Sequence, residues 1–168
     1  MILKYCDLFD DVLTRKNEIA HFTCSGFVLN ETKDKVLMIY HNIYNSWAWT
    51  GGHADGESDF LKVATRELQE ETGVNKVNPL VKNIFALDVL PVFGHIKNGR
   101  YVSAHIHISL AYLLEVSEQE LLSIKEDENS NVAWLPLDTF LNFVAEEHMK
   151  PVYMKIIEKA KSFKLLKL

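Results

Sequence analysis

A predicted helix with glutamates along one face, entered through a pair of glycines, restricts the fold and the chemistry of this chain more than any other segment. Residues 58–72 contain no glycine or proline, follow a polar capping segment and end at Gly73, which predicts a helix with defined ends. Residues three and four apart on a helix share a face, so Glu67, Glu70 and Glu71 place their carboxylates within little more than one turn. Like charges repel, and we therefore expect a compensating cation at this face.

Arg66 compensates only part of this negative charge. A hard divalent cation would compensate the rest, since Mg²⁺ prefers oxygen ligands and is usually held by one or two carboxylates together with substrate phosphates. Directly upstream, the segment WTGGH at 49–53 leads from a predicted strand into a tight loop, where paired glycines let the backbone approach a ligand closely. The pattern indicates metal-assisted displacement at phosphate. The alternative interpretation is an exposed acidic helix face.

The segment from Gly52 to Val74 resembles the signature of the Nudix hydrolase family, Gly-x5-Glu-x7-Arg-Glu-U-x-Glu-Glu-x-Gly-U, in which U is aliphatic. The second half, RELQEETGV from Arg66 onward, matches at every position, and thirteen residues separate Gly52 from Arg66, as the family spacing requires. The departure lies in the first half. Ser58 stands where the family has its first glutamate, and Glu57 stands one residue early.

The resemblance implies a role for each matching residue. In this family the signature forms a loop, a helix and a loop, and its glutamates hold Mg²⁺ or Mn²⁺ on a substrate diphosphate. By similarity, Glu70 and Glu71 are metal ligands, and Glu67 binds metal or acts as the base that prepares the attacking water. Arg66 is expected to orient Glu67 through a charge-assisted hydrogen bond. Gly52 is expected to offer a backbone carbonyl to the metal.

Two further acids are candidate metal ligands. Either Glu57 takes the place of the missing signature glutamate, or that contact is absent. In the family, another acid outside the signature often joins the site, several residues before a tryptophan. Glu128, six residues before Trp134, fits best, with Glu126 and Asp127 as rivals. The alternative for these three acids is a solvated loop.

Substrate-binding candidates come from histidines and aromatic residues near the signature. His105 and His107 alternate along a predicted strand, so both imidazoles face one side of a sheet, and we predict that they face the substrate. With His95 they would suggest zinc, but no Cys or His completes a familiar ligand spacing. Trp49 and Phe93 are predicted to stack on a base, and core packing is the alternative for each.

Strand and helix patterns alternate along the chain. Runs rich in aromatic and β-branched residues predict strands at 21–30, 35–42, 46–52, 84–90, 102–114 and 132–136, with a loop at 93–99. Further helices are predicted at 2–13, from Asp138 to Glu147, and from Pro151 onward. The fold class is therefore α/β (α+β), and the resemblance implies an α/β/α sandwich around a mixed sheet. We predict one domain over 1–168, with a helical extension at 1–19 and C-terminal helices at 137–168.

Composition excludes several classes of protein. A length of 168 residues with 48% hydrophobic side chains supplies one core, and a net charge of −5 excludes nonspecific nucleic-acid binding. No apolar run approaches the ~20 residues needed to cross a bilayer, and acids interrupt the first turns, so we expect no membrane partner. Cys6 and Cys24 are expected to be reduced, and the predicted location is cytoplasmic.

The predicted function is a divalent-metal-dependent pyrophosphohydrolase. It would cleave the phosphoanhydride of a nucleoside diphosphate linked to another moiety, by attack of water on phosphorus. Because Ser58 replaces a signature glutamate, the alternative is a catalytically weak domain that senses a nucleotide or nucleotide sugar. A third hypothesis, isomerisation of a prenyl diphosphate, requires a cysteine over the cleft, and Cys24 is the candidate. The predicted partner is a small nucleotide-type diphosphate, and the resemblance leaves a homodimer open.

Overall fold

The computed structural model of the chain describes residues 1–97 and 99–166, and its main element is a mixed β-sheet. The two central strands, β1 and β9, run parallel from the pair Ala20 and Ile106 to the pair Leu29 and Glu115. The other strand pairs are antiparallel, so the sheet order is β10-β2-β1-β9-β5, with β3, β4 and β6 pairing β2, β1 and β9. The strands of this sheet are β1 (Ala20–Leu29), β2 (Lys35–His41), β3 (Ser46–Ala48), β4 (Thr50–His53), β5 (Asn78–Pro79), β6 (Ala86–Val92), β9 (His105–Glu115) and β10 (Asn129–Pro136).

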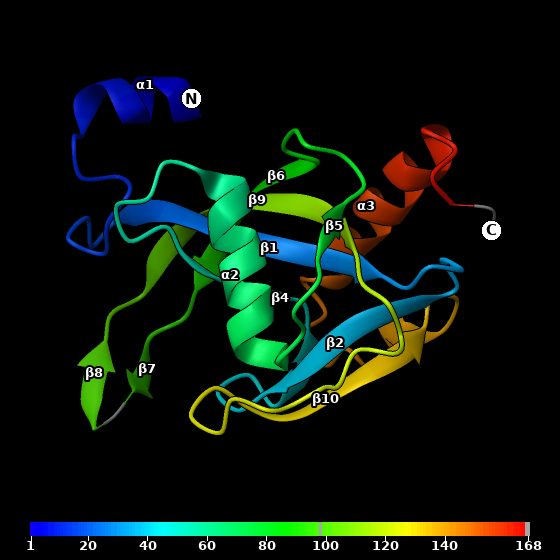
Figure 1. Cartoon of the computed structure of the whole chain (residues 1–168). Coiled ribbons are helices and arrows are strands. Elements are labelled where there is room, and N and C mark those ends of the chain that lie inside the picture. Colours follow the sequence, from blue (N-terminus) through cyan, green and yellow to red (C-terminus); the bar gives the residue numbers. More distant parts are fainter. Residues whose placement is uncertain (98, 167–168) are drawn as a thin grey trace.

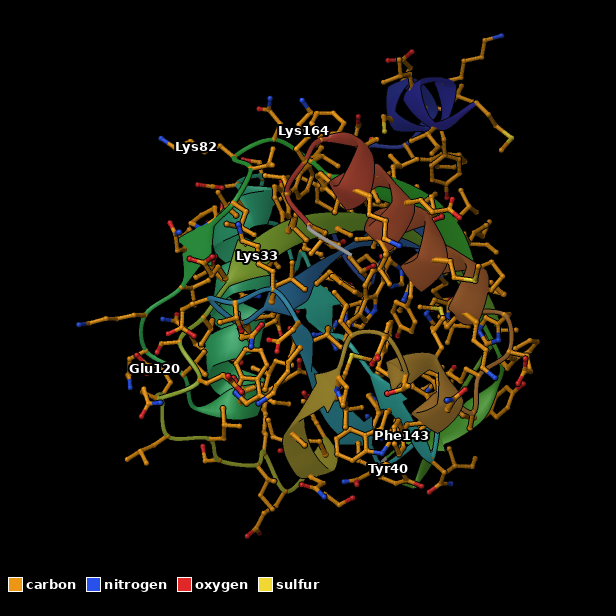
Figure 2. All side chains as sticks on the ribbon, turned by 90° about the vertical axis from the view of Figure 1, so that its right-hand side faces the viewer. Lys33, Tyr40, Lys82, Glu120, Phe143 and Lys164 are labelled. Atoms are coloured by element: carbon orange, nitrogen blue, oxygen red, sulfur yellow. The ribbon has the colours of Figure 1, made fainter. Side chains whose placement is uncertain are left out.

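Helices cover both faces of the sheet. The helix α2 (Phe60–Thr72) lies against one face, and α3 (Lys150–Ser162) lies against the other, as the two views in Figures 1 and 2 show. On the α2 side, Val63 and Leu68 belong to one buried apolar cluster with Val28 of β1. On the α3 side, Tyr153 packs with Phe27 of β1 in a second buried apolar cluster. The predicted sandwich of a mixed sheet between helices is confirmed.

The α2 helix has the ends that its sequence predicts. The Asp59 carboxylate accepts a hydrogen bond from the Lys62 backbone N–H at 3.1 Å, which caps the N-terminus. Gly73 ends the helix in the left-handed conformation with φ of 77°, where a side chain is disfavoured. The predicted helix at 58–72 thus begins two residues later and ends where expected.

Two predictions of local structure are wrong. The segment 138–147 forms only the 3-10 helix η1 (Phe140–Phe143), because the Ala145 N–H donates to the Ser46 hydroxyl at 2.9 Å instead of continuing a helix. The loop predicted at 93–99 contains β7 (His95–Lys97), which pairs with β8 (Arg100–Val102) in a separate two-stranded sheet.

The first predicted helix is shorter than its apolar spacing indicates. The helix α1 (Ile2–Leu8) ends at Phe9, which is extended. A series of turns follows, in which the Asp11 carboxylate accepts a hydrogen bond from the Asn17 side-chain amide at 2.9 Å. Among the described residues, no helix is long and apolar enough to cross a membrane. Of the predicted C-terminal helices, 167–168 lie outside the described residues.

Candidate functional site

A cleft of about 910 Å³ opens between α2, the strands β1, β4 and β9, and the segment around β7 and β8. Its lining is strongly acidic. Within the part of the chain that the structure describes, the acidic lining residues are Glu18, Asp55, Glu67, Glu70, Glu71, Asp127, Glu128 and Glu146. The lysine and arginine side chains that line it are Arg15, Arg66 and Lys125. Arg15 already pairs with Asp55 at 2.5 Å, so the carboxylates greatly exceed the fixed positive charges.

The glycine pair lets β4 lie directly against the carboxylates of α2. The Gly51 N–H donates to Glu71 Oε2 at 2.9 Å. At Gly52, a Cβ atom would overlap the Glu67 carboxylate, so glycine is required for this close approach. The backbone of β4 and two α2 glutamates therefore form one side of the cleft as a single packed unit.

Burial gives Glu71 an unusual titration. The carboxyl is 2% exposed, and desolvation raises its pKa to about 8, although the Gly51 hydrogen bond opposes the rise. The nearby carboxylates of Glu128 and Glu67 raise the pKa further. This carboxyl has more negative neighbours than cationic partners, which is the environment that a bound divalent cation stabilises.

Arg66 contacts two of the α2 glutamates. Its guanidinium donates to Glu67 Oε1 at 2.7 Å and lies 3.7 Å from Glu70 Oε1. It also reaches the backbone carbonyl of His53 at 3.4 Å, so it connects α2 to the end of β4. The position of the Glu67 carboxylate is thus fixed by Arg66 on one side and by Gly52 on the other.

A loop far away in the sequence brings a further acid to the cleft. Lys125 Nζ lies 3.3 Å from Glu128 Oε2 and 3.4 Å from Glu70 Oε2. The adjacent Asn129 side chain donates to the backbone carbonyl of Glu71 at 2.9 Å, which holds this loop against the C-terminal turn of α2. Asp127 also lines the cleft, whereas its neighbour Glu126 does not belong to the lining residues.

Glu57 lies outside this group. Its carboxylate pairs with Lys62 Nζ at 2.6 Å and accepts a hydrogen bond from the Asp59 backbone N–H at 2.9 Å. These contacts lower its pKa to about 2. Neither Glu57 nor the exposed Ser58 lines the cleft, so the structure does not bring Glu57 to the carboxylate cluster in place of the missing signature glutamate.

Both predicted aromatic residues line the cleft. Trp49 precedes β4, and its ring meets the Tyr153 ring edge-on at a centroid distance of 5.4 Å. Phe93 lies between β6 and β7 and is 70% exposed. A half-buried indole and an exposed phenyl ring therefore face a common opening.

His105 and His107 also line the cleft, and the sheet brings two further histidines beside them. His21 of β1 pairs with His107 of β9 in the parallel register, and His53 of β4 lies across from Thr23 of β1. Sequence reasoning missed His21 and His53, because only the strand register shows that they share a face with His107. His95, the third residue of the zinc interpretation, lines the cleft but is not part of this cluster.

Cys24 does not line the cleft. Its side chain is completely buried in the apolar cluster on the α2 side, and burial raises the pKa of the thiol to about 12. A cysteine in this position cannot act on a substrate in the cleft, so the isomerase hypothesis loses its candidate residue. Both cysteines are free, as expected.

The donor atoms of the carboxylate cluster fit a hard divalent cation. Glu67, Glu70, Glu71 and Glu128 provide oxygen ligands around the cleft, and Gly52 provides backbone beside them. Mg²⁺ and Mn²⁺ prefer this set, whereas soft metals prefer sulfur. When bound, such an ion neutralises phosphate oxygens and lowers the pKa of a coordinated water.

The fold and this site define a class of hydrolase in which a loop, a helix and a second loop present carboxylates beside a mixed sheet. The chain belongs to the Nudix family, because the model of the NUDIX domain matches residues 21–156. It is a Nudix family hydrolase, and such hydrolases generally use divalent metals.

Two curated relatives are similar in sequence. An RNA pyrophosphohydrolase from Bartonella bacilliformis is 30% identical over 129 residues, which cover 70% of this chain and 73% of that protein. A probable DHNTP pyrophosphohydrolase from Lactococcus lactis subsp. cremoris is 33% identical over 106 residues, which cover 62% of this chain and 59% of that protein.

Solved structures share the fold at lower identity. An Ap4A hydrolase from C. elegans, solved as a binary complex, has a TM-score of 0.60 and 15% identity, and the match covers 86% of this chain and 97% of that chain. A MutT protein from Methanosarcina mazei Go1 has a TM-score of 0.63 and 15% identity, covering 86% of this chain and 98% of that one.

Proposed function

We propose that this protein is a pyrophosphohydrolase that uses Mg²⁺ or Mn²⁺ to cleave the phosphoanhydride of a nucleoside diphosphate linked to another moiety. The observation that carries the proposal is the gathering of Glu67, Glu70, Glu71 and Glu128 in one cleft. Among the described residues, their ion-pair partners are Arg66 and Lys125. Carboxylates that exceed their cationic partners favour a divalent ion, and such an ion would in turn hold the substrate phosphates.

We assign a proposed role to each residue of the cleft from its position. Glu70, Glu71 and Glu128 are the proposed metal ligands, and the Gly52 carbonyl is the proposed backbone ligand. Glu67 is the proposed base or shared ligand, because its carboxylate is held by Arg66 at 2.7 Å and is packed against Gly52. Arg66 is a positioning residue, since a charge-assisted hydrogen bond fixes the orientation of the carboxylate that meets the water.

The nucleotide-type substrate is inferred from the lining of the cleft and from the relatives. Trp49 and Phe93 both line the cleft and are the proposed aromatic partners of a base. Both curated relatives are named as pyrophosphohydrolases, one acting on RNA and the other a probable DHNTP enzyme. A cleft of about 910 Å³ has the size of a small-molecule site.

The second candidate is a weakly catalytic sensor of a nucleotide or nucleotide sugar. It is favoured by one observation: Ser58 and Glu57 are both outside the cleft, and Glu57 is paired with Lys62. This hypothesis predicts tight ligand binding with little turnover. If the missing carboxylate limits catalysis, Ser58→Glu raises turnover, whereas an unchanged rate indicates that the reaction does not use a group at this position.

The deciding experiment is a substrate panel with a metal control. Phosphate release, coupled to a phosphatase where needed, is measured with nucleoside triphosphates, ADP-ribose, dinucleoside polyphosphates, NADH and nucleotide sugars. We expect turnover of one class with Mg²⁺ or Mn²⁺ and none with chelator. No turnover, with tight binding of one compound, would favour the sensor.

A variant links that activity to the carboxylate cluster. Glu67→Gln removes one charge with little change of volume, so we expect a loss of turnover of at least about a hundredfold with an unchanged unfolding transition. Glu126→Gln is the matched control, because Glu126 is outside the cleft lining. A rate near that of the wild type in Glu67→Gln would remove this residue from the mechanism.

Three wider features remain part of the proposal. We place the whole chain in a single catalytic domain with the α1 region as an N-terminal extension. A cytoplasmic location follows from the reduced state expected for its cysteines. A homodimer is to be tested by sedimentation of the purified chain.

A further inference from the structure

Four of the chain's seven histidines form a cluster on one face of the sheet, separate from the carboxylates. His21 stands on β1, with His53 on the adjacent strand β4 and with His105 and His107 on the adjacent strand β9. One ring nitrogen from each of these histidines lies within 4.8 Å of the corresponding atoms of the others. We refer to His21, His53, His105 and His107 as the histidine tetrad.

The hydrogen bonds of the tetrad direct lone pairs toward its centre. His21 Nδ1 lies 2.9 Å from the Asn17 carbonyl, and His105 Nδ1 lies 2.8 Å from the Ser103 carbonyl. A carbonyl oxygen can only accept, so the Nδ1 atom of each ring carries the proton. In the neutral form of each ring, Nε2 is then the acceptor. The His105 Nε2 lone pair faces His107 Nε2 at 3.2 Å. Backbone carbonyls that hold Nδ1–H in this way are the usual outer partners of metal-binding histidines.

One of these nitrogens has no hydrogen-bond partner among the residues that the structure describes. His21 is 3% exposed, and its Nε2 is buried without a hydrogen bond. Buried polar atoms are nearly always paired, so this atom indicates a missing ligand. The His21 ring centroid lies 5.0 Å from those of His53 and His105 and 5.2 Å from that of His107, so the ring that carries this atom lies beside the other three.

The spacing fits a four-coordinate metal. Zinc–imidazole bonds of about 2.0–2.1 Å place neighbouring nitrogens about 3.3–3.4 Å apart in a tetrahedron. His105 Nε2 and His107 Nε2 lie 3.2 Å apart as a hydrogen-bonded pair, which is close to this spacing. Metal binding would replace the proton between them. The remaining separations, up to 4.8 Å, require the rings to move inward by roughly an ångström or less, which rotation of the side chains can provide.

We infer that the histidine tetrad is a second metal site, which binds a borderline divalent transition metal such as Zn²⁺ through four imidazole nitrogens. Nitrogen ligands distinguish this site from the carboxylate cluster, because Mg²⁺ prefers oxygen. An anion is a poorer occupant, because the lone pairs of His21 and His105 face inward and repel negative charge. The inference concerns metal binding and does not depend on the proposed hydrolysis.

An ion bound by the tetrad would connect several strands of the sheet. It would join β4, β1 and β9 at the cleft, and His53 directly follows Gly52, whose backbone packs on the Glu67 carboxylate. The Arg66 guanidinium also reaches the His53 carbonyl at 3.4 Å. A metal on the tetrad would therefore fix the end of β4 on which the carboxylate cluster rests.

The test measures metal binding in chelator-treated protein with saturating Mg²⁺ present. Co²⁺ is the probe, because its visible absorption is much stronger in a tetrahedral nitrogen site than in an octahedral oxygen site. We expect one equivalent of Co²⁺ to give the tetrahedral spectrum, Zn²⁺ to displace it, and excess Mg²⁺ to have no effect. No binding, or an octahedral spectrum that Mg²⁺ removes, would overturn the inference.

Variants show whether the metal binds to the tetrad or to other groups of the cleft. Removing a group that only hydrogen-bonds to a metal ligand lowers metal affinity by about 10- to 100-fold. His107 is a proposed ligand itself, so we expect His107→Gln to weaken Co²⁺ and Zn²⁺ binding by at least about a hundredfold. His53→Gln and His105→Gln, which are less buried than His21, give the same test if His107→Gln does not fold. His148→Gln is the matched control, since His148 lines the cleft outside the tetrad, and Glu70→Gln controls for the carboxylate cluster.

Each outcome decides for or against the site. Normal Co²⁺ binding in the control variants together with weak binding in the tetrad variants supports it. Normal binding in the tetrad variants, or loss of binding in Glu70→Gln alone, would show that the metal binds to carboxylates. A thermal stabilisation by inorganic phosphate without metal, lost in the tetrad variants, would assign the tetrad to an anion instead.

Discussion

Gly52 shows how the absence of a side chain lets the backbone pack against the carboxylate of the proposed base, Glu67. A Cβ atom at this position would overlap the Glu67 carboxylate, while the same carboxylate accepts a hydrogen bond from Arg66 at 2.7 Å. A side chain at this position would therefore displace the carboxylate from its place beside Arg66. The requirement for glycine in the signature thus has a local physical cause in this chain.

Gly52→Ala tests that contact by a double-mutant cycle. Overpacking of this kind costs about 1–3 kcal/mol, so we expect the free energy of unfolding to fall by that amount. In a Glu67→Ala background the added methyl group has space, and its cost should drop below about 0.5 kcal/mol. Chemical denaturation of the four proteins measures both values. Equal costs in the two backgrounds would show that the glycine is required for another reason.

Glu71 predicts a pH dependence of stability in the metal-free protein. Its pKa is about 8 in the fold against an ordinary value of 4.5, so between these values the folded state holds a proton that the unfolded chain has lost. The free energy of unfolding contributed by this group therefore falls as pH rises from 4.5 to 8. Each pKa unit corresponds to about 1.4 kcal/mol, and we expect a fall of about 2 kcal/mol or more.

The comparison with Glu71→Gln isolates this carboxyl from other titrating groups. Glutamine keeps an acceptor for the Gly51 N–H but carries no charge, so its stability should lack this fall. Half-buried His107, whose pKa desolvation lowers to about 2, acts in the opposite direction in both proteins, and its contribution cancels in the difference. Denaturation at several pH values with chelator measures the difference. Parallel pH curves for the two proteins would contradict the prediction.

At the scale of elements, α2 depends on its own local signals. Asp59 caps its first turn through the Lys62 N–H, and Gly73 accepts the left-handed conformation at its end. These signals are visible in the sequence, which is why this helix was predicted nearly to the residue. The prediction of a helix at 138–147 was wrong because the Ala145 N–H donates a hydrogen bond to the Ser46 side chain. Ser46 lies ninety-nine residues earlier in the sequence, so no local signal shows this contact.

Asp59→Ala tests how far α2 relies on its cap. Loss of an N-cap side chain costs about 1 kcal/mol, and we expect a decrease of that size in the free energy of unfolding. Asp59→Asn keeps the acceptor and should have little effect. Thermal or urea denaturation gives both numbers. A cost for alanine no larger than that for asparagine would mean that the hydrogen bond at 3.1 Å contributes nothing.

At the scale of the whole molecule, the sequence spacing predicts the glutamates of the candidate site but does not predict its histidine tetrad. Glu67, Glu70 and Glu71 share one helix, so their proximity follows from helical geometry alone. The histidine tetrad comes from three strands and depends on the register that pairs His21 with His107. No spacing within a single element contains that information.

Tyr153 connects the far layer of the sandwich to the cleft. It is completely buried on α3, packs against Phe27 and Phe140, and its hydroxyl accepts a hydrogen bond from the Trp49 backbone N–H at 3.3 Å. The Trp49 ring lies against the Tyr153 ring. The helix α3 therefore supports Trp49, the residue that precedes β4 at the cleft.

Tyr153→Phe removes that support with almost no change of shape. The Trp49 N–H loses its acceptor, and because an unsatisfied buried donor costs about 1–3 kcal/mol, we expect a decrease in the free energy of unfolding within this range. Tyr40→Phe is the matched control, since the Tyr40 hydroxyl bonds the Asn45 carbonyl at an exposed position and its loss should cost far less. If Trp49 stacks on the substrate base as proposed, Tyr153→Phe also raises KM while kcat stays unchanged. Equal stability of the two variants would show that α3 supports the cleft through ring packing alone.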